Sequence, residues 1–399
     1  MNGRAREGGA AGGGAAADDL SFDVAVVGAG AVGAATAFFA ARAGLRVAVL
    51  DRGAPGGGTS SAGEGNVLVS DKDIGPELDL ARHSQRVWRE ELAEHGHHWE
   101  FESKGGVVVA ATLASRDALR ALTARQRAAG VVALDVGPDE LGALEPGLRP
   151  GLAGGAHYPE DAQVQPVLLV AHLLRLARAA GATVLPHEPV TGLLRSGERV
   201  TGVRTPRRSV VAPAVVNAAG TWAGEVAALA GVRLPVLPRR GFVLVTEPLP
   251  PTIRHKVYAA EYVGDVGSSD AALQSSPVIE GTPAGTVLIG STRERVGFDR
   301  RPSRAALGAL ARGALGLFPA LHAVRAIRAY HGFRPYCPDH LPVIGPDPRA
   351  PGLWHACGHE GAGIGLSAGT GQLLAQALTG GPTALDLAPF APDRKGLAA

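Results

Sequence analysis

Residues 23–51 read DVAVVGAGAVGAATAFFAARAGLRVAVLD. A short apolar run, a glycine cluster, a helical stretch to Arg42, a glycine turn and a second apolar run ending in an acid predict a β-α-β unit. Gly28, Gly30 and Gly33 form the pattern G-x-G-x-x-G directly between the first strand and the helix. Small residues there permit a tight turn, close approach of a pyrophosphate and close packing of the helix on the strand. The stretch therefore predicts a dinucleotide-binding unit.

The start of the helix and the end of the second strand supply the other expected contacts of this unit. Ala31 and Val32 open the helix, where free backbone N–H groups and the helix dipole favour phosphate charge. Asp51 ends the second strand, where a carboxylate can accept hydrogen bonds from both ribose hydroxyls. Arg52 follows it directly. An acid at the strand end disfavours a 2′-phosphate, but it does not separate NAD from FAD.

The segment after the second strand favours FAD over NAD. Residues 52–71 read RGAPGGGTSSAGEGNVLVSD, which is too polar for a strand and does not return quickly to a third β-α-β strand. Hydroxyls and backbone N–H groups of such a loop can lie along a second set of phosphates and a flavin ring. The alternative is a loop in solvent. The residues expected to contact the cofactor here are Thr59, Ser60, Glu64, Gly65 and Asn66.

Composition excludes several classes of protein. The 399 residues are 46% hydrophobic and carry a formal net charge of +2, so nucleic acid and anionic membrane are not expected partners. Cys337 and Cys357 are the two cysteines, too few for a disulfide framework or a four-cysteine metal site, and no metal is expected. No apolar run reaches membrane-spanning length, and a cytoplasmic location is expected. Residues 1–20 are rich in glycine and alanine and are expected to form a disordered leader.

Two later segments make the pattern specific. Residues 215–231 read VVNAAGTWAGEVAALAG, and GFRPYCPDHLPVIGP at 332–346 is followed by LWHACGHEGAGIGLSAGTGQLLAQAL at 353–378. With the glycine unit and the loop at 59–66, they resemble the D-amino-acid oxidase superfamily of FAD-dependent oxidoreductases. The chain looks most like glycine oxidase and the flavin subunits of hydroxyproline and opine dehydrogenases.

The resemblance implies an α/β fold with two interleaved domains. One is a glutathione-reductase-like Rossmann domain that binds FAD, and the other is a substrate domain built on a mainly antiparallel β-sheet. We expect the FAD domain to comprise residues 21–86, 150–236 and 328–392. The substrate domain is expected at residues 87–149 and 237–327.

The resemblance also implies further cofactor contacts. Val190 falls near the adenine side, and the segment after the strand at 214–217 contributes Ala219, Gly220 and Trp222. The loop that approaches the flavin pyrimidine comprises Gly358, His359, Glu360, Gly361, Ala362, Gly363 and Ile364. His359 is a candidate base or a packing residue, and Glu360 a pocket acid or a solvated one. The cysteine and histidine that link flavin covalently in some relatives have no counterpart, so non-covalent FAD is expected.

The chemistry that the resemblance implies is hydride transfer from the substrate's α-carbon to flavin N5. Arg334 falls where the carboxylate-binding arginine is expected, and its planar guanidinium suits a carboxylate. The alternative is a structural arginine paired with Asp339. Other pocket-wall candidates, for which core or surface positions are the more common outcome, are Tyr258, Tyr262, His331 and Tyr336.

The reaction expected is oxidation of the C–N bond of an amino acid or a secondary or imino amino acid, giving an imine. The alternatives are an FAD-dependent 2-hydroxy acid dehydrogenase and a non-catalytic flavin subunit of a larger complex. Electrons would pass to O₂ or to a partner electron-transfer subunit, in a homo- or hetero-oligomer. Lys256 is a positional candidate for a lysine that activates oxygen.

Overall fold

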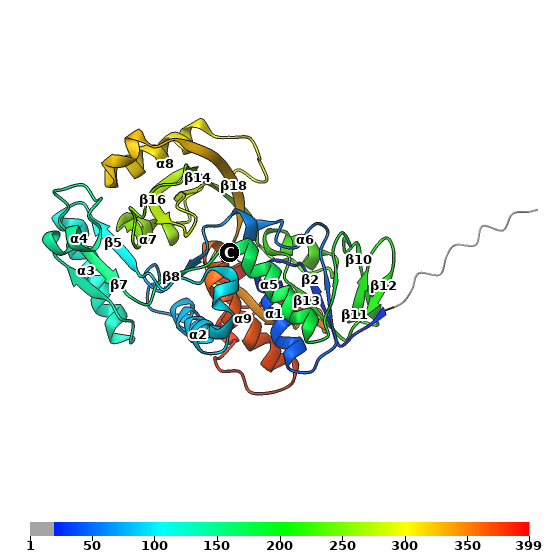
Figure 1. The fold of residues 1–399 in the computed structure, drawn as a ribbon. Helices are drawn as coiled ribbons and strands as arrows, with labels where there is room; N and C mark the ends of the chain where they lie inside the picture. The colour runs from blue at the N-terminus through cyan, green and yellow to red at the C-terminus, as the bar shows by residue number, and fades with distance from the viewer. Residues whose placement is uncertain (1–19, 399) are drawn as a thin grey trace, which may run out of the picture.

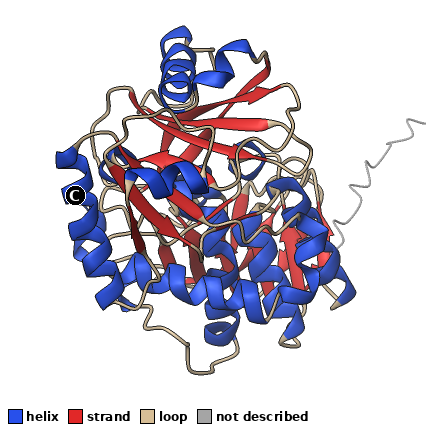
Figure 2. Ribbon diagram, turned by 60° about the vertical axis from the view of Figure 1, so that its left-hand side comes forward, coloured by secondary structure: helices blue, strands red, loops and turns tan. Residues whose placement is uncertain are grey.

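The computed structural model describes residues 20–398, apart from the side chains of residues 265, 266 and 398, and the expected leader at 1–20 lies outside the described residues except for Leu20. In Figure 1 one group of elements surrounds α1, α5 and α9, and a second group surrounds β14, β16 and α8. Each group is built on one large sheet. The view coloured by secondary structure shows helices covering these sheets (Figure 2).

The first large sheet has six strands and is mainly parallel. Its strands, in spatial order, are β19 (Val343–Pro346), β20 (Leu353–Cys357), β13 (Ala214–Asn217), β2 (Val24–Val27), β3 (Val47–Leu50) and β9 (Thr183–Leu185). Every pair is parallel except β19 with β20. All residues of β2 and β3 are buried, as expected for strands covered on both faces. The predicted β-α-β unit is confirmed.

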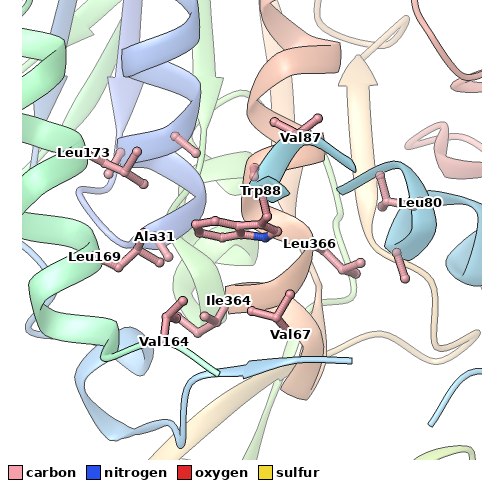
Figure 3. Packing of buried hydrophobic residues seen from close by; sticks show 14 of the residues in the cluster. Ala31, Val67, Leu80, Val87, Trp88, Val164, Leu169, Leu173, Ile364 and Leu366 are labelled. Atoms are coloured by element: carbon pink, nitrogen blue, oxygen red, sulfur yellow. The ribbon is translucent and has the colours of Figure 1, made fainter. Parts of the chain in front are cut away.

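The helices around this sheet pack closely because they present small residues. The helices and short 3₁₀ turns here are α1 (Ala31–Arg42), η1 (Thr59–Ala62), α2 (Pro76–Glu90), η2 (Ala93–Trp99), α5 (Pro166–Ala179), η3 (Gly220–Trp222), α6 (Ala223–Ala228), η5 (Glu360–Ala362), α9 (Gly363–Leu378), η6 (Ala388–Phe390) and η7 (Lys395–Ala398). A Cβ on Gly371 of α9 would lie 2.6 Å from the carbonyl carbon of Ala35 in α1. Figure 3 shows Trp88 of α2 among Ala31, Leu169 and Leu366, which joins four helices in one core.

The second large sheet has eight strands and is mainly antiparallel. Its strands, in spatial order, are β18 (Ala326–Tyr336), β14 (Leu237–Thr246), β17 (Val287–Arg293), β16 (Gln274–Gly281), β15 (Lys256–Ala259), β5 (Gly106–Ala110), β7 (Gly154–Tyr158) and β6 (Leu134–Val136). Only β15 and β5 pair in parallel. The accompanying helices are α3 (Leu113–Ala128), α4 (Pro138–Leu144), α7 (Glu261–Val266), α8 (Arg304–Leu317) and η4 (Pro319–Ala323).

Two small sheets complete the described elements. One contains β1 (Leu20–Ser21), β12 (Ser209–Val211), β11 (Arg199–Arg204) and β10 (Gly192–Ser196), and the other pairs β4 (Asn66–Val67) with β8 (Ala162–Gln163). The expected combination of a parallel sheet with a mainly antiparallel one is confirmed. The domain boundaries stay a prediction. Both β7 and β18 belong to the eight-stranded sheet, although most of their residues fall in the ranges expected for the FAD domain.

Candidate active site

A cavity of about 640 Å³ lies where the strand ends of the six-stranded sheet meet β14 and β18. Its size is within the range of small-molecule and cofactor sites. Of the residues expected from the sequence to contact cofactor or substrate, all line this cavity except Gly33 and Ala362. Segments from residue 27 to residue 364 therefore converge on one site.

Two glycines of the glycine unit, Gly28 and Gly33, have no space for a Cβ. Gly28 has a φ of 110°, and a Cβ on it would lie 2.5 Å from the carbonyl oxygen of Ala218. A Cβ on Gly33 would lie 2.0 Å from the carbonyl oxygen of Gly28, so Gly33 brings α1 against the turn without lining the cavity. Gly30 is the helix N-cap and makes no side-chain cap hydrogen bond. The turn leaves the helix N-terminus facing the cavity, where an anion is stabilised.

Asp51 lies at the cavity wall as expected. Its two carboxylate oxygens accept hydrogen bonds from the backbone N–H groups of Ala29, at 2.7 Å, and Gly53, at 2.8 Å. Glu188, which no sequence motif indicated, also lines the cavity and is 2% exposed. Its Oε1 lies 3.2 Å from Nε of Arg208, and its Oε2 has no hydrogen-bond partner among residues 20–398. Two acids therefore stand beside Val190, where ribose hydroxyls would donate.

The loop at 59–66 is tied to β18 beside Arg334. The hydroxyls of Thr59 and Thr221 both donate to the backbone carbonyl of Phe333, each at 2.7 Å. The backbone N–H of Ala31 donates to Oγ of Ser60 at 3.0 Å. These bonds join the first βα turn, the loop and β18, so the cofactor end and the substrate end of the cavity have fixed relative positions.

Aromatic stacking covers another part of the wall. The guanidinium of Arg52 lies 4.0 Å from the ring centroid of Trp222. Trp222 in turn stacks on Phe298, with centroids 5.5 Å apart and planes 6° from parallel. This stack gives Arg52 and Trp222 fixed positions beside the glycine turn.

Arg334 is half-buried in the cavity wall and has no acid within ion-pair distance among the described residues. Its Nη1 donates to the backbone carbonyl of Thr292 at 2.8 Å. A Cβ on Gly241 would lie 2.2 Å from that Nη1, so only glycine leaves room for the guanidinium. Asp339, the acid expected to pair with a structural Arg334, pairs instead with Arg394, at 2.6 Å. Burial, with the nearby Arg293, lowers the pKa of Arg334 to about 10, so it is cationic at neutral pH.

Tyr262, one of the pocket-wall candidates, and Arg293, which the sequence did not indicate, lie near Arg334. Tyr262 lines the cavity and is 6% exposed, and the guanidinium of Arg293 lies 4.9 Å from its ring centroid. Nη1 of Arg293 has no hydrogen-bond partner among residues 20–398. The other pocket-wall candidates do not line the cavity, and Tyr258 and Tyr336 are buried while His331 is partly buried.

The polar side chains of the loop that precedes α9 contact other residues of the protein. Nε2 of His359 lies 3.1 Å from Oγ1 of Thr370, and burial lowers the pKa of His359 to about 3. A histidine with so low a pKa is a poor base, which favours the packing role. Glu360 lies 3.3 Å from Nη1 of Arg239 and 2.9 Å from Nδ1 of His340, so it is a paired acid rather than a solvated one.

The burial of His359 predicts a pH-dependent stability. Between about pH 3 and the unfolded value of about 6.5 the unfolded chain binds a proton that the folded chain does not, so acid destabilises the fold. At pH 5 this contribution amounts to about 2 kcal/mol. Between pH 7 and pH 5, we expect the unfolding free energy of the parent to fall by about 2 kcal/mol more than that of His359→Gln. Urea unfolding at both pH values measures it, and equal losses would contradict the assignment.

Neither the candidate lysine nor the two cysteines takes a reactive position. Lys256 is 1% exposed, forms a buried ion pair with Glu280 and does not line the cavity. Cys337 is buried away from it. Cys357 lines the cavity, but burial raises the pKa of its thiol to about 12, so it stays protonated. Non-covalent attachment of FAD stays a prediction.

The residues at the cavity fit FAD. The turn at Gly28 has no room for a Cβ, the α1 N-terminus faces the cavity, and Asp51 and Glu188 supply acceptors for ribose. A family model described as FAD dependent oxidoreductase, the DAO family, matches residues 23–377. The chain belongs to the DAO family of FAD-dependent oxidoreductases.

Relatives of this DAO-family chain cover nearly its whole length. It is 32% identical to hydrogen cyanide synthase subunit HcnC of Pseudomonas aeruginosa, over 93% of this chain and 95% of that protein. It is 30% identical to glycine oxidase of Pseudomonas putida, over 94% of this chain and 99% of that one. The crystal structure of glycine oxidase from Geobacillus kaustophilus matches with a TM-score of 0.85 and 30% identity, over 94% and 99% of the two chains.

These similarities confirm the expected family, fold class, FAD cofactor and oxidoreductase activity. The L-proline dehydrogenase from P. horikoshii shares the fold, with a TM-score of 0.85 at 22% identity over 94% and 97% of the two chains. Within residues 20–398, no helix combines the length and the apolar composition that a membrane crossing requires.

Proposed function

We propose that this enzyme oxidises the C–N bond of an amino acid, including secondary amino acids, and gives an imine. The observation that carries the proposal is Arg334, a cationic guanidinium in the cavity wall with no acid partner among the described residues. A partly desolvated cation without a counterion favours a bound anion, and a planar fork is complementary to a carboxylate. The substrate's carboxylate would supply that anion.

The relatives support an amine as the second group of the substrate. Proteins named glycine oxidase and sarcosine dehydrogenase match this chain at 30% and 29% identity. The sarcosine dehydrogenase match covers 88% of this chain and 39% of the human protein. The names of these relatives describe amino acids whose amine is primary in one case and secondary in the other.

The chain's own residues would bind and orient. FAD, when bound, supplies the acceptor for the hydride that leaves the α-carbon. Arg334 would hold the carboxylate so that the C–H bond points to the flavin, and Tyr262 would form the adjoining wall. Backbone N–H groups at the start of α9, beginning at Gly363, would stabilise the negative charge that develops on the reduced ring.

The proposal also includes the expected mode of FAD binding, the expected FAD domain and the expected electron acceptors. FAD would be bound non-covalently through the expected contacts, in a domain formed by residues 21–86, 150–236 and 328–392. Electrons would leave to O₂ or to a partner subunit, and one relative, HcnC, is itself named as a subunit of an enzyme. A dehydrogenase with a partner is the form we favour.

Anaerobic mixing of the purified holoenzyme with a substrate panel tests the proposal. The panel contains D-, L-, N-methyl and cyclic amino acids together with the matching 2-hydroxy acids. We expect amino acids to bleach the flavin band, at about 450 nm for a bound flavin, and the 2-hydroxy acids to leave it unchanged.

The outcomes separate the alternatives. Colour that returns quickly in air indicates an oxidase, and bleaching that persists in air indicates a dehydrogenase that needs a partner. Bleaching by 2-hydroxy acids alone would replace the proposal with a hydroxy acid dehydrogenase. A yellow protein that no compound bleaches would indicate a non-catalytic flavin subunit.

A further inference from the structure

Glu64 is a buried acid whose position is fixed by the backbone on both sides. It lies between η1 and β4, lines the cavity and is 6% exposed. The next residue, Gly65, has a φ of 87°, and a Cβ on it would lie 1.8 Å from the carbonyl oxygen of Val164. On the other side, a Cβ on Gly290 would lie 2.1 Å from Oε1 of Glu64. The carboxyl group is therefore held against β17 and has little freedom to leave the cavity.

The carboxyl group has no fixed partner. Oε1 of Glu64 is buried, and among the described side chains it has neither a hydrogen-bond partner nor a basic group within ion-pair distance. A buried carboxyl group without a partner is costly, because it has lost its hydration and gained nothing in return. Such a group favours a ligand that donates a hydrogen bond or a proton to it.

The titratable groups that interact with Glu64 lie on four strands of the eight-stranded sheet and on one helix. They belong to Lys256 of β15, Glu280 of β16, Arg293 of β17, Arg334 and Tyr330 of β18, and Tyr262 of α7. Burial raises the pKa of Glu64 to about 7; Lys256 opposes the rise, Glu280 adds to it, and the two arginines oppose it. Glu64 therefore changes charge near neutral pH.

Of the other acids in the cavity wall, Glu225 is exposed to solvent, and the remaining ones have partners. Glu360 is paired with Arg239, and Glu188 with Arg208. Asp51 accepts two backbone hydrogen bonds beside the glycine turn. His359 contacts Thr370 and is neutral. Glu64 is the acid of the cavity wall whose charge acts on Arg334, the residue expected to hold the substrate carboxylate.

We propose that Glu64 accepts a proton from the protonated amine of the substrate before hydride transfer. The inference rests on the proposed oxidation of an amine. The N–H bond of the ammonium breaks, its electron pair stays on nitrogen, and the proton forms an O–H bond with the Glu64 carboxylate. With FAD bound as the hydride acceptor, the neutral amine would be able to lose hydride from its α-carbon, because its nitrogen lone pair would stabilise the resulting iminium. An ammonium has no lone pair and cannot do so.

Glu64→Gln and Glu64→Asp test the proposal, with Glu198→Gln in the exposed β10–β11 turn as the matched control. The rate of anaerobic flavin reduction by an amino acid found active with the parent is followed between pH 6 and pH 10. We expect the parent rate to rise through about pH 7, where Glu64 becomes a carboxylate. At pH 7 the reduction rate of Glu64→Gln should be about tenfold or more below that of the parent. It should increase only as the pH approaches the pKa of the substrate amine itself, about 10 for an alkylammonium. Glu64→Asp should restore part of the lost rate.

A substrate-free measurement provides a second readout. Because Glu64 lines the cavity, its charge would act on a flavin bound there. The flavin absorption spectrum should therefore change with a midpoint near pH 7 in the parent and show no such step in Glu64→Gln. Parallel pH profiles for parent and Glu64→Gln, or a spectral step that survives in Glu64→Gln, would overturn the role of Glu64 while the amine oxidation stands. Failure of every amine to reduce the parent flavin would instead overturn the proposed function. If Glu64→Gln does not retain FAD, the role of Glu64 is tested instead by the rate of Glu64→Asp and by the pH titration of the parent spectrum.

Discussion

Replacing Arg334 with methionine should lower kcat/KM for a carboxylate-bearing amine by roughly 10²–10³-fold. Methionine keeps the apolar stem but removes the guanidinium, so the substrate carboxylate would enter a partly desolvated wall with no counterion. Truncating one partner of a buried hydrogen-bonded charge pair costs roughly 2–5 kcal/mol, which corresponds to this range. FAD content should stay at the parent level, because Thr59 and Thr221 hold the loop through the backbone carbonyl of Phe333 and not through Arg334.

Steady-state and anaerobic kinetics measure the effect, with Arg328→Met as the control. Arg328 lies on the same strand but is exposed, and it does not line the cavity. An amine that lacks a carboxylate should react equally slowly with parent and Arg334→Met. A variant that keeps the parent kcat/KM for the amino acid would show that the carboxylate binds elsewhere.

Gly28→Ala should raise the Kd for FAD by roughly 100-fold and yield largely colourless protein. The alanine would combine a φ of 110° with a Cβ only 2.5 Å from the carbonyl oxygen of Ala218. Strained backbone and overpacking each cost about 1–3 kcal/mol, and relief requires the turn to move away from the position that a pyrophosphate needs. Binding is therefore weakened even where the chain still folds.

A second glycine of the same β-α-β unit allows the effect of backbone strain to be measured without a steric conflict. Gly44 follows the end of α1 with a φ of 89°, and a Cβ there meets nothing within 4 Å. Gly44→Ala should lower stability by about 1 kcal/mol and leave FAD affinity unchanged. Both variants are compared by the ratio of flavin to protein absorbance and by titration of apoprotein with FAD. Equal affinity in Gly28→Ala and Gly44→Ala would show that the close approach at Ala218 has no role in binding.

The sequence predicts best what depends on neighbouring residues. The β-α-β unit at 23–51 follows from apolar periodicity and from glycines at a turn, and both are local properties. Arg334 was identified through a resemblance, and the structure places it in the cavity wall. Its lack of an acid partner depends on the pairing of Asp339 with Arg394, which joins residues far apart in the chain. No local pattern reveals that choice.

The residues that were missed reach the site through long-range packing. Glu188 follows the short strand β9, far along the chain from the glycine turn. Tyr262, which the sequence offered only as a candidate, lies in α7 after β15 of the other large sheet. Gly241 reveals its importance only through the pairing of β14 with β18, which brings it opposite Gly332 and under Arg334. The orphan carboxyl of Glu64 depends in the same way on β17, whose sequence distance from Glu64 exceeds two hundred residues. Register across the sheets, which the sequence alone does not determine, decides these contacts.

The arrangement of the cavity wall has a consequence for how the enzyme matures. The wall draws on residues near 28, 64, 190, 220, 334 and 361, and β20, which precedes the last of these segments, pairs in parallel with β13. During synthesis from the N-terminus, the glycine turn emerges long before the segments that close the flavin end. The complete FAD site therefore requires synthesis to have passed residue 364, and the stabilisation that ligand binding provides is absent until then. In a cell short of flavin, newly made chains would accumulate as apoprotein, the form most exposed to proteolysis.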